Sequence, residues 1–225
     1  VGVLEEERRE ADARPLAAFE SSDPMLNRLF ANGMRTWRNY VNHFIVDIPR
    51  ERCVWGAESI YSEIPATYCY DLAPNHRLMN RVWLTGAMTR EGIPGNIGVG
   101  KRLTTATSGY IWSVSPLFIA SKLFEHYGDL DPARTYYDKL RFLVLDYPVK
   151  HSERDGTIPT PHQLADHAPI SDVKRNPAKG DLITAMVYFE VLNRFARLAD
   201  ALGKPDDANR AREHAAKVRA TILSF

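Results

Sequence analysis

The acidic segment, residues 47–58, has the sequence DIPRERCVWGAE and gathers charged side chains of both signs. Three of its side chains are carboxylates: Asp47, Glu51 and Glu58. Hydrolysis of a glycosidic bond needs two carboxyl groups, one to protonate the leaving oxygen and one to activate water or attack the anomeric carbon. Arg50 and Arg52 would hold neighbouring carboxylates ionised. Ion pairs on a surface loop have the same composition, so the charges alone fit a catalytic cluster or surface salt bridges.

Aromatic and polar side chains elsewhere are candidates to bind a hydroxylated ligand. Trp55 lies within the acidic segment and offers a flat apolar face for a sugar ring. Trp112 begins an expected helix just after a glycine-rich stretch, where it fits either a sugar-stacking aromatic or a core or rim side chain. Asp166 and His167 lie in a long polar loop, from which they could contact such a ligand.

Two other sequence patterns argue against a phosphate-binding loop and against a metal site. The stretch GNIGVGK matches G-x-x-x-x-G-K, but Arg102 follows where a phosphate-binding loop has Ser or Thr, and no hydrophobic strand precedes it. The histidines His151, His162 and His167 lack the spacing of a metal site. Cys53 has no His near it in sequence and is a weak nucleophile candidate. We therefore expect neither a metal nor a cofactor.

Composition describes an ordinary soluble globular chain. The 225 residues carry a formal charge of +1, with 44% hydrophobic and 25% charged residues. A near-neutral charge argues against nucleic-acid binding, and two cysteines are too few for a disulfide scaffold. The longest uncharged run, 103–121, contains Thr, Ser, Gly and Pro116, so we expect no membrane span. The N-terminus lacks the apolar core of a signal peptide and an initiator Met, which leaves the compartment open.

Apolar residues at helical spacing predict an all-α fold with almost no strand. Seven helices are expected: 24–41, one from 55, 74–90, 111–127, one from 132, 181–202 and one from 205. Ser22 or Asp23 should cap the first helix, and Pro65 should kink or end the second. Gly128 and Gly203 should end the fourth and sixth.

The third expected helix should place its apolar residues on one face. These residues are Leu78, Val82, Trp83 and Ala87. Short turns such as GDLDP and GKP would join antiparallel neighbours into helical hairpins. The longer polar loops, gathered at one end of the helices, would then carry the site.

Four pieces of the sequence stand in the order seen in one enzyme family: FESSDPMLNRLFANGMRTWRNY, DIPRERCVWGAES, LFEHYGDLDPARTYYDKLRFLVLDY, and the stretch from DLITAMVYFE to the end. Over residues 17–225 the chain thereby resembles the α-L-rhamnosidases of glycoside hydrolase family 78. The first piece is similar to the helix that opens the family's catalytic domain, and the second to its acidic signature. The others resemble a Tyr-Gly-Asp turn between barrel helices and a late helical hairpin.

The resemblance implies an (α/α)6 barrel and an inverting hydrolase that releases terminal α-L-rhamnose from a rhamnosylated glycoside or polysaccharide. Glu51 matches the family's general acid, while Asp47, Trp55 and Glu58 match positions that line the rhamnose pocket. The remaining candidate substrate-binding residues are Arg52, Trp112, Asp166 and His167. LADHAP, around Asp166, is similar to a Gly-Asp-Trp-Leu stretch of the family.

The chain also departs from the family's pattern. The spacing from Asp47 to Glu51 is one residue shorter, Glu58 replaces the usual Asp, and Ala57 stands where Gly is common. These changes put substrate preference in doubt more than reaction class.

Seven helices are too few for six hairpins. We therefore expect residues 21–225 to be the N-terminal part of the catalytic domain, incomplete at its C-terminal side, with the general base outside the chain. Residues 1–20 would be a linker or the end of a preceding β-domain. Two alternatives stay open: another (α/α)6 carbohydrate enzyme such as a glycoside phosphorylase, and a non-catalytic carbohydrate-binding helical scaffold. A facing carboxylate would support an inverting hydrolase, and a basic pocket in place of water would favour the phosphorylase.

Overall fold

The computed structural model describes residues 14–42, 44–45, 55–56, 60, 63–86, 88, 92–95, 110–151 and 177–224. Helices dominate this part of the chain, as the sequence predicts. The helices are α1 (Pro24–Tyr40), α3 (Glu63–Cys69), α4 (Ala73–Thr85), α5 (Tyr110–Ser113), α6 (Ser115–Tyr127), α7 (Asp131–Thr135), α8 (Tyr137–Arg141), the π-helix η1 (Phe142–Asp146), α9 (Tyr147–His151), α11 (Pro177–Ala201) and α12 (Pro205–Ile222). Two short strands, β1 (Val41–Asn42) and β2 (Phe44–Ile45), pair antiparallel.

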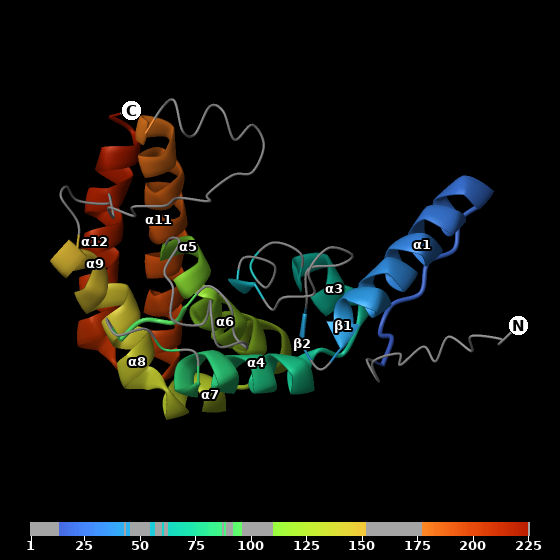
Figure 1. Ribbon diagram of the computed structural model, residues 1–225, viewed down its shortest axis with the longest axis horizontal. Coiled ribbons are helices and arrows are strands. Elements are labelled where there is room, and N and C mark those ends of the chain that lie inside the picture. The colour runs from blue at the N-terminus through green and yellow to red at the C-terminus, as the bar shows by residue number, and fades with distance from the viewer. Residues whose placement is uncertain are drawn as a thin grey trace, which may run out of the picture.

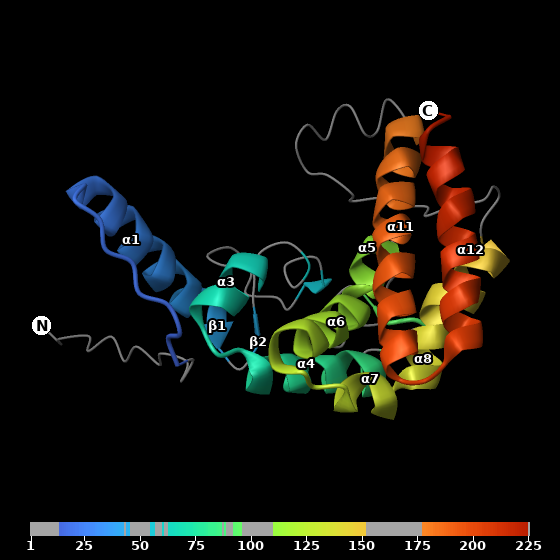
Figure 2. The same ribbon diagram turned by 180° about the vertical axis from the view of Figure 1, so that it is seen from behind.

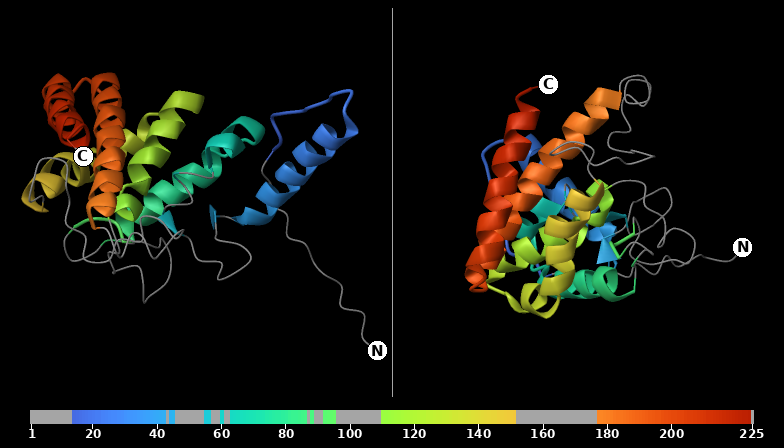
Figure 3. Two further views of the ribbon diagram at one scale, coloured as in Figure 1. Left: turned by 90° about the horizontal axis from the view of Figure 1, so that it is seen from above. Right: turned by 90° about the vertical axis from the view of Figure 1, so that its left-hand side faces the viewer.

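The helices follow one another across the molecule from α1 at one end to the α11–α12 hairpin at the other (Figure 1). The view from behind and the view from above show the same order, with α3, α4 and α6 between the two ends (Figures 2 and 3). α6 packs against both α4 and α11. It therefore links the two halves of the described structure.

α1 begins as the sequence predicts. The Asp23 carboxylate accepts a 2.7 Å hydrogen bond from the backbone N–H of Met25, which satisfies one of the free donors at the start of the helix. Near the other end of α1, the Tyr70 hydroxyl donates to the Met34 carbonyl at 2.7 Å. The first half of α1 leaves its apolar side chains in solvent: Leu29 is 58% exposed.

Gly56 and Ile60 are helical, in agreement with the helix expected from residue 55, whereas α4 differs from expectation in extent. Pro65 lies in the first turn of α3, where its missing N–H costs no intrahelical bond. α4 ends at Thr85 instead of running to residue 90, because Gly86 terminates it. Beyond Gly86, Met88 forms an antiparallel bridge with Pro94 instead of another helical turn.

The buried face of α4 is also different from the predicted one. Leu78 and Val82 are only half-buried, and Ala87 lies outside the described residues. The buried residues are Ala73, His76, Met79, Asn80, Trp83 and Leu84. Trp83 is buried as predicted and donates to the Gly95 carbonyl at 3.3 Å, and Asn80, which was not predicted, donates to the Pro116 carbonyl at 2.6 Å. Contacts with neighbouring segments therefore determine which residues of α4 are buried, and helical periodicity does not reveal these contacts.

The helix expected from residue 132 is divided into α7, α8, η1 and α9. The π-helix within it widens the turn, and side chains from other helices bond to three successive carbonyls. Tyr110 donates to Leu143 at 3.1 Å, Tyr188 to Val144 at 3.1 Å, and Arg210 to Leu145 at 3.2 Å. The main chain of η1 is thereby bonded to α5, α11 and α12.

The remaining helix boundaries follow local signals. Gly128 and Gly203 have φ angles of 66° and 69° and end α6 and α11 as predicted, since glycine adopts this left-handed conformation without strain. The helix expected at 181–202 starts earlier, at Pro177. α12 begins at Pro205 as expected.

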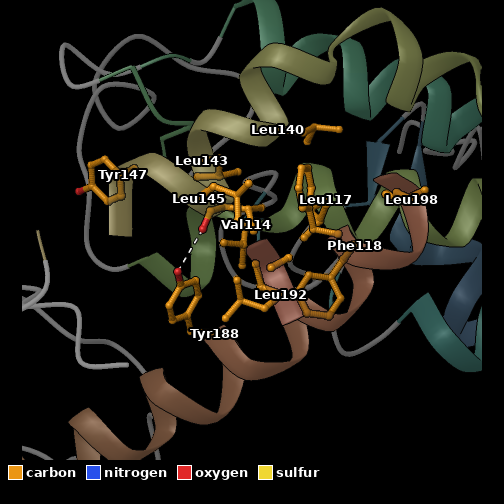
Figure 4. Close-up of a cluster of buried hydrophobic side chains, with 14 of the residues drawn as sticks. Val114, Leu117, Phe118, Leu140, Leu143, Leu145, Tyr147, Tyr188, Leu192 and Leu198 are labelled. Carbon is orange, nitrogen blue, oxygen red and sulfur yellow. Dashed lines mark hydrogen bonds between the residues drawn. The ribbon is translucent and has the colours of Figure 1, made fainter. Parts of the chain in front are cut away.

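Two clusters of buried side chains form the core. The larger joins α5, α6, the π-helix, α11 and α12. Figure 4 shows part of it, with side chains of α6, the π-helix and α11. The smaller lies among α3, α4 and α6, and Met34 and Trp37 of α1 pack against it. Residues 115–123 of α6 are all buried because this helix contributes to both clusters.

Candidate functional site

Most of the predicted site residues lie outside the part of the chain that the structure describes. These are Asp47, Glu51, Arg52, Glu58, Asp166 and His167. Their roles stay predictions. Trp55 and Trp112 are described, and the structure brings the segments that carry them together.

The acidic segment is anchored at Gly56 against the junction of α5 and α6. Gly56 is buried, and a Cβ atom placed on it would lie 2.3 Å from the Ser115 hydroxyl oxygen and 2.4 Å from the Trp112 carbonyl oxygen. The Ser115 hydroxyl itself donates to that carbonyl at 2.6 Å. Trp55, next to Gly56, is half-buried and packs against the larger core cluster. The backbone of the acidic segment therefore touches the backbone of α5 at this point.

Trp112 is a core side chain in its described surroundings. It is 6% exposed and belongs to the larger cluster with Tyr110, Ile111 and Val114. Of the two interpretations that the sequence allowed, its burial agrees with packing. Its contact with a ligand stays a prediction.

An aromatic cluster at the start of α5 was not predicted. The rings of Tyr110 and Tyr147 stack with centroids 6.2 Å apart, and Tyr188 meets Tyr110 edge-on at 5.7 Å. His151 stacks on Tyr147 at 4.3 Å. Burial, followed by the influence of Tyr188 and Tyr147, raises the pKa of the Tyr110 phenol well above its ordinary value. Tyr110 therefore stays neutral and able to donate its hydrogen bond.

These contacts place the ends of three long connections beside α5. Gly56 belongs to the acidic segment, Tyr110 follows the connection 96–109, and His151 precedes the connection 152–176. The Gly56–Trp112 contact and the ring contacts of Tyr110, Tyr147 and His151 bring them together. A site carried by loops would lie where such connections meet. In sequence, these tyrosines look like ordinary core residues at helical spacing, which is why the cluster was missed.

A separate hollow of about 560 Å³ lies elsewhere, between the α7–α8 break and the α11–α12 turn. Basic and aromatic side chains form most of its lining, together with Asp138: Arg134, Tyr136, Tyr137, Lys139 and Lys204. Neither of the two site candidates that the structure describes, Trp55 and Trp112, lines it. We therefore do not assign the predicted chemistry to it.

The described residues offer no metal site and no membrane-spanning element. No group of three or more His, Cys, Asp or Glu side chains among them could hold a metal ion. No helix in the described ranges is both long and apolar enough to cross a membrane.

The chain is similar in fold to several solved α-L-rhamnosidases. The enzyme of Streptomyces avermitilis complexed with L-rhamnose gives a TM-score of 0.79 at 24% identity, over 96% of this chain and 20% of that one. The Klebsiella oxytoca rhamnosidase with rhamnose bound gives 0.76 at 16% identity, over 93% and 40%. The Dictyoglumus thermophilum enzyme gives 0.75 at 17% identity, over 95% and 24%. No curated protein sequence matches the chain.

These similarities show the fold, and the chain spans at most 40% of the length of these three enzymes. Family membership comes from the sequence. Residues 14–224 match the family described as the bacterial alpha-L-rhamnosidase 6 hairpin glycosidase domain. The predicted all-α, six-hairpin fold and the resemblance to α-L-rhamnosidases are thereby confirmed. The chain belongs to the six-hairpin glycosidase domain family of bacterial α-L-rhamnosidases.

Proposed function

We propose that this domain is part of an α-L-rhamnosidase that releases terminal α-L-rhamnose from a glycoside or polysaccharide by inverting hydrolysis. The family match over residues 14–224 carries the proposal. Two structural relatives hold rhamnose, which supports rhamnose as the sugar.

Glu51 is the proposed general acid, and Asp47 and Glu58 complete the acidic group around the sugar. A general acid must keep its proton near neutral pH, so its pocket should raise its pKa by desolvation and by nearby carboxylates. A second carboxylate from a later hairpin would activate water from the opposite face. In an inverting enzyme the two groups stand roughly 6.5–9.5 Å apart.

The anchoring of Gly56 supports a site above α5. Glu51 and Glu58 flank Gly56 closely in sequence. Because Gly56 is fixed against buried backbone, the residues beside it start from a rigid base. Trp55, Arg52, Trp112, Asp166 and His167 are the proposed contacts to the sugar.

The test uses the protein that carries this domain and two rhamnosides, one with a nitrophenol leaving group and one with a natural alcohol. We expect release of L-rhamnose from both, and proton NMR at early times should show the β-anomer, since inversion converts an α-glycoside to a β-sugar. The corresponding glucoside is the control and should not be cleaved.

Three other results would each refute part of the proposal. Release of α-rhamnose first would refute inversion. A requirement for phosphate with formation of rhamnose 1-phosphate would identify a phosphorylase. Binding of rhamnose without turnover would identify a non-catalytic scaffold.

A further inference from the structure

The contact between Gly56 and α5 is closer than any side chain allows. Cβ atoms essentially never come within 3.0 Å of another heavy atom, yet a Cβ on Gly56 would meet two oxygens at 2.3 and 2.4 Å. One of these oxygens is the Trp112 carbonyl, which is backbone and cannot rotate away. Gly56 is therefore required by space.

The Ser115 hydroxyl fixes the surface that Gly56 touches. Its 2.6 Å hydrogen bond to the Trp112 carbonyl spans the break between α5 and α6, and Ser115 is fully buried. The bond satisfies a buried carbonyl and also holds the serine side chain in one orientation. Gly56 thus packs against a defined hydroxyl rather than a mobile one.

The start of α5 is fixed as well. Tyr110, the first residue of α5, donates to the Leu143 carbonyl of the π-helix. Tyr188 contacts the Tyr110 ring. The Tyr188 hydroxyl donates to the next carbonyl, that of Val144 (Figure 4). π-Helical turns often occur at functional sites. α5 is consequently bonded to the π-helix at its first residue and contacted by Gly56 at Trp112.

We propose that Gly56 and Ser115, with Tyr110 fixing the start of α5, are positioning residues that hold the acidic segment at Gly56 against the junction of α5 and α6. The inference rests on the proposed function, because its consequence is the placement of the Glu51 carboxyl for proton transfer. Glu58 is two residues from Gly56 and Glu51 is five, so a displacement of Gly56 is passed to both through few peptide units.

The size of the effect follows from the contact distances. A methyl group on Gly56 must move from 2.4 Å to an ordinary contact beyond 3.4 Å, so the segment shifts by about 1 Å. A misplacement of this size can cost about 10²-fold in rate. The loss should fall mainly on kcat for the natural rhamnoside, whose leaving group needs the acid, and less on kcat for the nitrophenyl rhamnoside.

The experiment compares Gly56→Ala, Ser115→Ala and the double variant in the protein that carries this domain. Gly33→Ala is the matched control, since Gly33 lies in α1 with nothing within 4 Å of its Cβ position. We expect Gly56→Ala to lower kcat about 10²-fold on the natural rhamnoside and clearly less on the nitrophenyl one, with Gly33→Ala unchanged on both. Ser115→Ala should lower the ratio of kcat on the natural rhamnoside to kcat on the nitrophenyl rhamnoside by a smaller factor, about 3–10-fold, because the Trp112 carbonyl loses its hydrogen bond. The double variant should recover part of the Gly56→Ala loss, since one of its two clashes is gone.

Two results would overturn the inference. One is a Gly56→Ala variant whose kcat is unchanged, or falls equally on both substrates. The other is a Ser115→Ala variant in which the ratio of kcat on the natural rhamnoside to kcat on the nitrophenyl rhamnoside equals that of wild type. This second result decides the matter if Gly56→Ala does not fold. Failure of the proposed function is separate: the wild-type protein would then cleave neither rhamnoside, and the inference would fall with it.

Discussion

Asp207 joins α12 to α8, and its removal should loosen α12 measurably. Its two carboxylate oxygens accept hydrogen bonds from the Tyr137 hydroxyl at 2.8 Å and the Arg141 guanidinium at 2.9 Å. Asp207→Asn keeps one acceptor oxygen but loses the charge and one of these bonds. A hydrogen bond to a charged group contributes about 1.5–3 kcal/mol. Because Arg141 is 35% exposed, water replaces part of its bond, so we expect a loss near the middle, about 2 kcal/mol.

Hydrogen exchange of the α12 amides measures this loss locally, which suits a domain within a larger protein. A loss of about 2 kcal/mol corresponds to roughly 30-fold faster exchange at pH 7. The control is Asp131→Asn, which breaks an ion pair with Arg134 in which both side chains are well exposed. Such pairs contribute about 0–1 kcal/mol, so exchange should change by only a few-fold.

The same pair of proteins gives a pH test. Burial raises the pKa of the Asp207 carboxyl, but the hydrogen bonds from Tyr137 and Arg141 outweigh burial and leave it below its usual value. A carboxyl whose pKa is lowered on folding stabilises the fold above its unfolded pKa, about 3.9, and this contribution is lost as the pH falls through the folded pKa. The advantage of wild type over Asp207→Asn should persist from pH 7 to about pH 5 and shrink toward pH 3. Equal exchange at pH 7, or an advantage that does not shrink in acid, would refute the reasoning.

Three further predictions concern the site, the core and the exposed helix. Glu51→Gln should lower turnover about 10²–10⁴-fold on a natural rhamnoside and much less on a nitrophenyl rhamnoside; equal losses on both would place the acid elsewhere, with Glu58 as the next candidate. Leu192→Ala, at a fully buried position of α11, should cost about 2–5 kcal/mol in local unfolding by hydrogen exchange, whereas Met186→Ala, 54% exposed on the same helix, should cost under about 0.5 kcal/mol. The 225 residues expressed alone should associate through the exposed apolar face of α1 and lack activity on aryl rhamnosides, and Leu29→Glu should reduce the association seen by light scattering; a monomeric, active chain would contradict this.

The helices that sequence predicted well are those whose ends carry local signals. Asp23 caps α1 through a bond to a residue two positions away, and Gly128 and Gly203 end their helices by their own backbone preference. The prediction for the buried face of α4 was right for Trp83 but missed Asn80, a polar residue that is buried and donates to the Pro116 carbonyl. The sequence also did not predict the π-helix that divides the helix expected from residue 132. Its carbonyls accept hydrogen bonds from side chains that are distant in the sequence, Tyr110 and Tyr188.

The candidate site likewise has features that local sequence predicts and features that depend on distant contacts. Residue types in the acidic segment were sufficient to suggest sugar chemistry and to support the resemblance to a family, and the sequence match confirmed the family. Nothing in the sequence indicated that Gly56, within the acidic segment, has a structural role. The need for glycine there arises from Ser115 and the Trp112 backbone, which are far away in the sequence.

The location of this contact bears on how precisely the acidic segment is held. A catalytic carboxyl misplaced by about 1 Å loses much of its effect. Ser115 is the first residue of α6, the helix that contributes to both core clusters and is buried through residue 123. Opening such a helix requires disruption of both clusters, so it belongs to the most stable part of the described structure. The acidic segment touches α6 at its first turn through Gly56, a residue with no side chain, and is therefore held by that rigid helix two residues from Glu58 and five residues from Glu51 in the sequence.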